Sequence, residues 1–359
     1  MRELKAISVK TQVRRLKYFS VFSEIIGKKG CNIELLRIMV DKWSDDHESD
    51  FQSYFSLTGE INQKKLNKAT GRYERKNKIT QSLKNYLDAS KSLFLTSQEK
   101  GWIYPSRMML ILREATQNFN PLNAFALNNV EKVFFLYSLL LHDSDRLLSV
   151  YELIRDNPGQ SLKEYQKDFK NHYLLFLEKK INQINTSSIV KEKYYEAYKR
   201  VKEWRSPERY SEDIVPPRIN WWLDLGFINT KLFVENKVII SKHINQDFCS
   251  LEDTYFKNSI LLIEGGNLSL WQNLEEEKKE KLVSFYLIRA KALFGVLNLP
   301  RLPLNDTMFF LCFKLFQKES IIADMSEIVN WIGFEKQING VKLGIRKSGR
   351  SYESYLYLK

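Results

Sequence analysis

Residues 77–104, NKITQSLKNYLDASKSLFLTSQEKGWIY, carry the patterns that most clearly indicate a fold. Its first half repeats apolar residues with the period of an α-helix, at Ile79, Leu83, Tyr86 and Leu87. That period predicts a helix from Asn77 to Ser90 with one face toward a core. The opposite face would then carry polar residues such as Gln81 and Lys84.

The second half predicts a β-hairpin. Residues 93–96 and 102–104 are rich in strand-forming side chains, and residues 98–101 between them end in glycine. A helix followed by a β-hairpin is the order found in a winged helix, so we expect such a unit in the first 120 residues.

The same order returns twice further along the chain. After Pro216-Pro217 a short helix is predicted over 218–225, ending at Gly226, with strands 227–234 and 237–240 pairing across 235–236. Near the C-terminus, helices are predicted over 307–316 and 326–332. They precede a hairpin of 341–346 with 351–358, whose tyrosines 352, 355 and 357 favour a strand.

The residues between these units, about 127–205, read as helical throughout. Ser161 and Glu164 form a capping-box pattern at the start of one of these helices. The predicted fold class is mainly α with small β-hairpins, in which several winged-helix-like units are joined by a helical middle. The predicted domains are 1–120, 121–205, 206–300 and 301–359.

The charge of the chain favours polyanionic partners. The 359 residues carry a formal net charge of +13, and the sequence pI is near 9.3. Residues 1–120 contain 22 Lys/Arg against 13 Asp/Glu. Such an excess indicates nucleic acid or an anionic membrane surface as a partner. A lysine-rich composition with random placement is the alternative.

The cysteines and the N-terminus indicate a cytoplasmic protein. Cys31, Cys249 and Cys312 are too far apart to suggest a disulfide framework or a zinc site. The N-terminus lacks the apolar run of a signal peptide, and no apolar stretch is long enough for a membrane span. We therefore expect no membrane association, no metal and no cofactor.

The densest basic segment, residues 62–84, is the first candidate nucleic-acid-binding site. Its candidate residues are Lys64, Lys65, Lys68, Arg72, Arg75, Lys76, Lys78, Gln81 and Lys84. Cations neutralise phosphates, while amide side chains contact base edges or phosphates. The alternative is a solvated basic loop and helix face.

The second candidate site is the tip of the C-terminal hairpin, where Arg346, Lys347 and Arg350 cluster. A glycine at such a tip lets the backbone approach a phosphate closely. The alternative is a charged hairpin that protects an edge strand from aggregation. A third candidate is the helix carrying Trp221 and Trp222, for which packing in the core is the alternative.

One pattern suggests catalysis. Asp224 precedes Glu235-Asn236-Lys237, a spacing that resembles the PD-(D/E)XK nucleases, in which two acids and a lysine hold Mg²⁺ and activate water. However, Asp224 falls in a predicted helix and residues 235–236 read as a turn. The four histidines show no metal or triad spacing, and no phosphate-binding loop is present. An enzyme is thus the less favoured reading.

The string Trp222–Ile228, WLDLGFI, and the order of elements resemble the DNA-recognition portions of type IIS restriction endonucleases and other multi-winged-helix proteins of prokaryotic defence systems. The resemblance implies a subunit that reads double-stranded DNA for an anti-phage or restriction system and works with other protein subunits. The alternatives are a Mg²⁺-dependent nuclease and a protein-interaction adaptor with a basic docking face.

Overall fold

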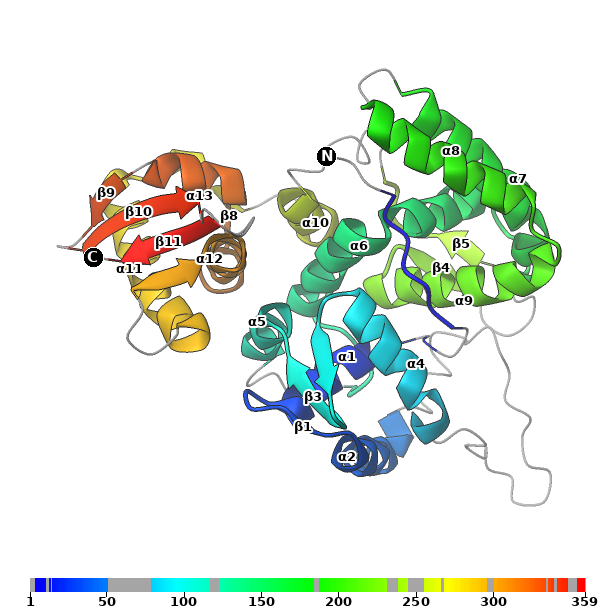
Figure 1. Cartoon of the computed structure of the whole chain (residues 1–359), viewed down its shortest axis with the longest axis horizontal. Helices are drawn as coiled ribbons and strands as arrows, with labels where there is room; N and C mark the ends of the chain where they lie inside the picture. Colours follow the sequence, from blue (N-terminus) through cyan, green and yellow to red (C-terminus); the bar gives the residue numbers. More distant parts are fainter. Residues whose placement is uncertain are drawn as a thin grey trace.

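The computed structural model describes residues 4–10, 13, 15–50, 79–116, 123–183, 187–230, 238–244, 255–265, 268–295, 300–333, 335–338, 341–347 and 354–358. The described part is mainly helical with small sheets, which confirms the predicted fold class (Figure 1). None of its helices is both long and apolar enough to cross a membrane.

The N-terminal elements form a three-stranded sheet with helices around it. They are α1 (Lys17–Ile26), β1 (Cys31–Asn32), α2 (Ile33–Asp46), α4 (Ile79–Ser92), β2 (Thr96–Glu99), β3 (Trp102–Pro105) and α5 (Arg107–Thr116). The strand order is β1-β3-β2, and both pairings are antiparallel. This order of elements with this pairing is the topology of a winged helix.

The hairpin of this unit begins later than predicted. Leu93 and Leu95 are fully buried in the turn after α4, where Phe94 takes a left-handed φ of 56° between them. The strand therefore starts at Thr96. The loop is the two-residue turn Lys100-Gly101, with φ values of 47° and 80°, which matches the twist of the flanking strands.

Four long helices form the middle of the chain. They are α6 (Asn129–Asp156), α7 (Leu162–Ile181), α8 (Ser188–Lys202) and α9 (Pro207–Leu225), followed by β4 (Ile228–Thr230), β5 (Val238–Ile240) and α10 (Tyr255–Glu264). The capping box of Ser161 and Glu164 at the start of α7 is confirmed. So is the pairing of β4 with β5.

Helix α9 begins at Pro207, well before the predicted start. The prediction took Pro216-Pro217 as a helix opening, because proline breaks an internal helical hydrogen bond. Instead, both prolines lie inside α9, within a run from Ile214 to Trp222 that is buried throughout. Burial of this run against the rest of the protein offsets the cost of the missing hydrogen bonds.

Both tryptophans of α9 are fully buried, so their packing in the core is confirmed. The indole N–H of Trp221 donates to the carbonyl of Val13, and that of Trp222 donates to the carbonyl of Leu147. The two adjacent side chains can both be buried because α9 contacts the N-terminal segment through Trp221 and α6 through Trp222.

The N-terminal segment is fixed to α6 by two buried carboxylates at a kink. Asp143 has non-helical backbone angles, which divides α6 in two. Its carboxylate accepts a hydrogen bond from the amide of Ile7 (2.9 Å). The carboxylate of Asp145 accepts one from the amide of Lys5 (2.6 Å), and the amide of Asp145 donates to the carbonyl of Lys5. The carbonyl of Lys5 therefore supplies an acceptor for the amide of Asp145, next to the kink in α6.

Three buried ion pairs complete this anchoring. Arg218 of α9 makes two 2.8 Å bonds to Asp143, and neither side chain is exposed. Arg15 pairs with Asp224 at 2.7 Å, and Lys17 pairs with Glu131 at 2.7 Å. The three pairs join residues that are 75, 209 and 114 positions apart in the sequence through charges that have little access to water.

Asp145 makes stability depend on pH. Burial raises the pKa of its carboxyl from 3.8 to about 6. Because the folded-state pKa is raised, the proton on Asp145 stabilises the fold at low pH, and this contribution is lost as pH rises through about 6. We expect Asp145→Asn to reduce the loss of unfolding free energy between pH 4 and 7.5 by about 2 kcal/mol. Urea unfolding of both proteins at the two pH values measures it, and parallel pH profiles would contradict it.

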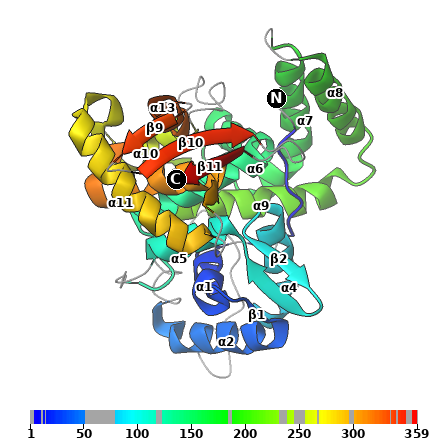
Figure 2. The ribbon, with the colours of Figure 1, turned by 60° about the vertical axis from the view of Figure 1, so that its left-hand side comes forward.

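The C-terminal elements form a second, larger sheet. They are β6 (Ser269–Leu270), the 3₁₀ turn Trp271–Asn273, α11 (Glu276–Phe294), β7 (Arg301–Pro303), α12 (Leu304–Glu319), β8 (Ile321–Ile322), α13 (Met325–Ile332), β9 (Glu335–Ile338), β10 (Val341–Lys347) and β11 (Ser354–Leu358). The order β7-β11-β10-β9 is antiparallel throughout, and β9, β10 and β11 lie together in Figure 2. Strands β6 and β8 pair separately.

The predicted C-terminal hairpin is present as β10 and β11, but two further strands flank it. β7 adds to β11, and β9 adds to β10. One side of the sheet carries the buried side chains of Leu302, Leu343 and Leu356. Helix α12 packs against this sheet through β7 and β11, and α13 packs against β10.

Candidate nucleic-acid interface

Most of the first predicted site cannot be placed. Lys64, Lys65, Lys68, Arg72, Arg75, Lys76 and Lys78 lie outside the described residues. Gln81 lies in the first turn of α4, where only the backbone is described. Lys84 is exposed on α4. This basic segment leads directly into α4, the helix that precedes the wing hairpin.

Helix α4 has the two faces that the sequence predicted. Leu83, Tyr86 and Leu87 are buried against the core of the N-terminal unit. Lys84 and Asp88 are exposed on the other side, one turn apart. In a helix-turn-helix protein, the second helix places such outward polar residues in the major groove.

The cations on this face differ in their contacts. Lys91 donates to the amide oxygen of Gln98 at 2.5 Å and lies 3.9 Å from the carboxylate of Asp88. For Lys84, no carboxylate of the described residues lies within ion-pair distance.

The wing exposes two aromatic side chains that the sequence analysis missed as surface residues. Trp102 is 45% exposed and Tyr104 is 39% exposed, while Ile103 between them is buried. This alternation places both rings on the same face of β3. The alternation of Trp102, Ile103 and Tyr104 was visible in the sequence. Which side of β3 faces solvent, however, depends on its pairing with β1, which lies about seventy residues earlier in the sequence.

A glycine permits this arrangement. Gly30, just before β1, has a φ of +83°. A Cβ there would lie 2.6 Å from the carbonyl oxygen of Ile103 and 2.9 Å from the ring of Tyr104. Any other residue would therefore push the wing strand away from its neighbour.

The second predicted site lies on the outer face of the C-terminal sheet. Arg346 is exposed on β10, whereas only the backbone of Lys347 is described and Arg350 lies outside the described residues. Arg346 is paired across the strands with Tyr355, and Tyr357 is paired with Arg301 of β7. Because side chains alternate along a strand, these four residues share one face of the sheet.

On this face each arginine lies over a tyrosine ring. The guanidinium of Arg301 is 5.1 Å from the ring centre of Tyr355, and that of Arg346 is 5.5 Å from the ring centre of Tyr357. Such cation–π contacts hold the arginine side chains against the sheet.

Among the described residues, these two arginines also lack acidic neighbours. Within the described part of the chain, no carboxylate is in ion-pair distance of Arg301 or Arg346. Other arginines do have one, such as Arg107 with Asp306 at 3.0 Å. Arg346 was predicted from the sequence but Arg301 was not, because β7 is separated from the hairpin by α12 and α13.

The residues of the nuclease pattern do not form a described site. Asp224 is buried near the end of α9, where Arg15 and the amide of Leu16 occupy both oxygens of its carboxylate at 2.7 and 2.9 Å. Glu235 and Lys237 lie outside the described residues. Among the described residues, no three His, Cys, Asp or Glu side chains are grouped so as to hold a metal ion.

Comparison of the chain with family models, with curated proteins and with solved structures gives no match.

Proposed function

We propose that the protein binds double-stranded DNA through its N-terminal winged-helix unit and serves as the DNA-recognition subunit of a prokaryotic defence or restriction system. The observation that carries the proposal is the sheet order β1-β3-β2 with α4 leading into its hairpin. That topology leaves the outer face of α4 and the wing side by side on one unit.

The charge distribution supports the same partner. The segment that enters α4 from residue 62 is rich in lysine and arginine. Lys84 adds an exposed positive charge on α4, and Lys100 is exposed at the tip of the wing. Cations on a recognition helix and a wing neutralise phosphates on either side of a groove, which fixes the register of the protein on the duplex.

The system-level part of the proposal rests on the resemblance of the element order and of the string at residues 222–228 to recognition portions of restriction endonucleases. It is an analogy between folds. In this view catalysis belongs to another chain, and this protein contributes recognition.

Substitution of Lys84 by glutamate tests the role of α4. We expect the dissociation constant for a labelled 30-base-pair duplex to rise about fivefold to tenfold at low salt, because a phosphate contact becomes a repulsion. Fluorescence anisotropy measures it. Lys167→Glu, on the exposed face of α7, is the matched control and should leave the affinity within twofold. An equal loss in both variants would mean that only net charge matters and would count against α4.

A further inference from the structure

The outer face of the C-terminal sheet combines partly exposed aromatic rings with cations. Its residues are Arg301 on β7, Tyr355 and Tyr357 on β11, and Lys342 and Arg346 on β10. The only acid placed on this face by the described pairings is Glu335, which forms an ion pair with Lys342 at 2.7 Å. Among the described residues the face is therefore net positive, and none of their carboxylates lies within ion-pair distance of Arg301 or Arg346.

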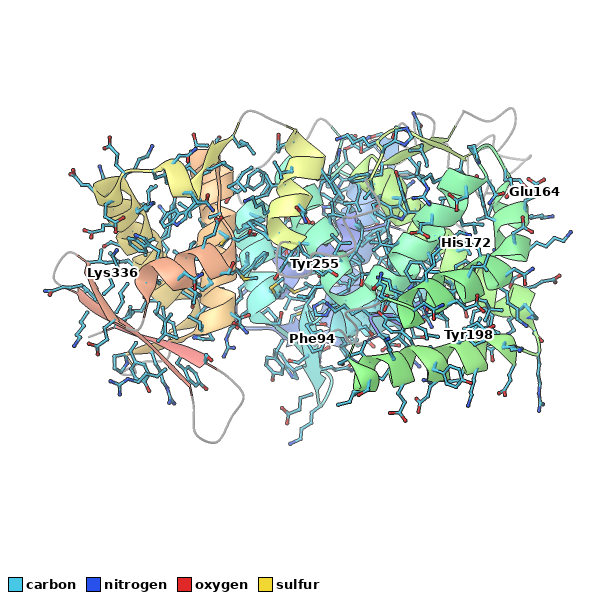
Figure 3. The ribbon with its side chains drawn as sticks, turned by 90° about the horizontal axis from the view of Figure 1, so that it is seen from above. Phe94, Glu164, His172, Tyr198, Tyr255 and Lys336 are labelled. Carbon is cyan, nitrogen blue, oxygen red and sulfur yellow. The ribbon has the colours of Figure 1, made fainter. Side chains whose placement is uncertain are left out.

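This face is also open. Helices α12 and α13 contact the sheet, and α11 contacts its edge strand β7. The leucines buried beneath the sheet, Leu302, Leu343 and Leu356, alternate with the outer residues along their strands and therefore lie on the opposite side. In Figure 3 no described helix or strand covers the outer side, and the side chains there extend away from the helices.

We propose that this face binds single-stranded DNA, with bases stacked on the guanidinium–tyrosine pairs Arg301–Tyr355 and Arg346–Tyr357 and phosphates bound by the N–H groups at the edges of the two guanidinium groups. The two rings are two residues apart on one strand, which separates them by about 7 Å along the sheet. Aromatic residues on the open face of a four-stranded sheet stack the bases of an unpaired strand in this way.

The arginines favour a nucleic acid over a protein partner. Each guanidinium rests on a ring, so its position is set before a ligand arrives and less side-chain entropy is lost on binding. Its N–H groups can still donate to a phosphate, alone or in a fork. A polyanion that also offers flat aromatic surfaces matches both kinds of side chain at once.

An unpaired strand suits this face better than a duplex. The bases of a duplex are stacked on one another, so tyrosines on a flat sheet cannot reach their faces, whereas an unpaired strand can splay its bases outward. This inference rests on the proposed function only in the choice of DNA as the polymer. Single-stranded binding by the sheet and duplex binding by the winged helix use different residues, so an experiment can refute one proposal without refuting the other.

The test is a titration of labelled oligo-dT of 15 nucleotides, followed by anisotropy, with the full-length protein. The double substitution Tyr355→Ala and Tyr357→Ala should weaken binding about tenfold to a hundredfold, since each stacked base contributes substantially. The double substitution to phenylalanine keeps both rings and should bind within about twofold of the unchanged protein. Thermal unfolding checks that each variant is folded.

A second pair of substitutions covers the case in which the alanine variant does not fold. Arg301→Gln with Arg346→Gln leaves the strand pairings in place and should weaken binding to oligo-dT about tenfold and flatten its salt dependence. Duplex DNA is titrated against the same variants and against Lys84→Glu. We expect the sheet variants to retain duplex binding and Lys84→Glu to retain binding to oligo-dT.

Three results would overturn the proposal. One is the absence of binding of oligo-dT to the unchanged protein at low salt. Another is equal binding by the alanine and phenylalanine variants. The third is binding of oligo-U in place of oligo-dT, which would make RNA the ligand. Loss of duplex binding by Lys84→Glu is independent of all three.

Discussion

Replacement of Asp143 by alanine is expected to lower the free energy of unfolding by about 3–5 kcal/mol. The carboxylate binds the guanidinium of Arg218 through two 2.8 Å bonds and also accepts from the amide of Ile7. Neither charged side chain is exposed. Its removal leaves a buried cation without its counter-charge and a backbone amide without its acceptor, and urea unfolding measures the loss.

The matched control removes both charges. Asp143→Leu combined with Arg218→Met should cost less than Asp143→Ala alone, because no unpaired charge remains in the core. The kink of α6 and the N-terminal segment meet at this pair, so the single variant should also expose residues 4–10 to proteolysis. A single variant as stable as the unchanged protein would show that Arg218 finds another partner and would refute the anchoring described above.

Asp224→Ala is expected to have a similar effect, about 3–5 kcal/mol. Its carboxylate pairs with Arg15, whose side chain is 4% exposed, and accepts from the amide of Leu16. Arg15 and Leu16 belong to the segment that leads into α1 of the winged-helix unit. Asp88→Ala, at an exposed acid of α4, is the control and should change stability by less than about 0.5 kcal/mol.

This substitution also separates an anchoring role from catalysis. If Asp224 served a nuclease, its alanine variant would remain as stable as the unchanged protein while losing Mg²⁺-dependent cleavage of DNA. That combination would contradict the role we assign to Asp224. A large loss of stability, measured by urea unfolding without any metal, agrees with it.

Local patterns predicted the helices and hairpins well. The apolar period of α4 and the capping box of α7 depend on residues within a few positions of one another. Errors arose where burial overrides local preference. Pro216 and Pro217 lie inside α9 because their surroundings are fully buried, and Leu93–Leu95 leave the strand because both leucines fill the core.

Long-range contacts could not be predicted from the sequence. Nothing near Ile7 indicates that its amide binds Asp143, since the pair depends on a kink in α6. In the same way, the sequence marked Tyr355 and Tyr357 as strand residues but could not place them beside Arg301. That neighbour comes from β7, and only the pairing of β7 with β11 creates the shared face.

The most direct test of the proposed function is the salt dependence of duplex DNA binding. We predict that log K falls steeply with log salt, and that joint neutralisation of Lys64, Lys65, Arg72, Arg75 and Lys76 reduces the slope by up to about 4.5, since each phosphate contact contributes about 0.9. Absence of duplex binding at 50 mM salt, or an unchanged slope in the fivefold variant, would contradict the account.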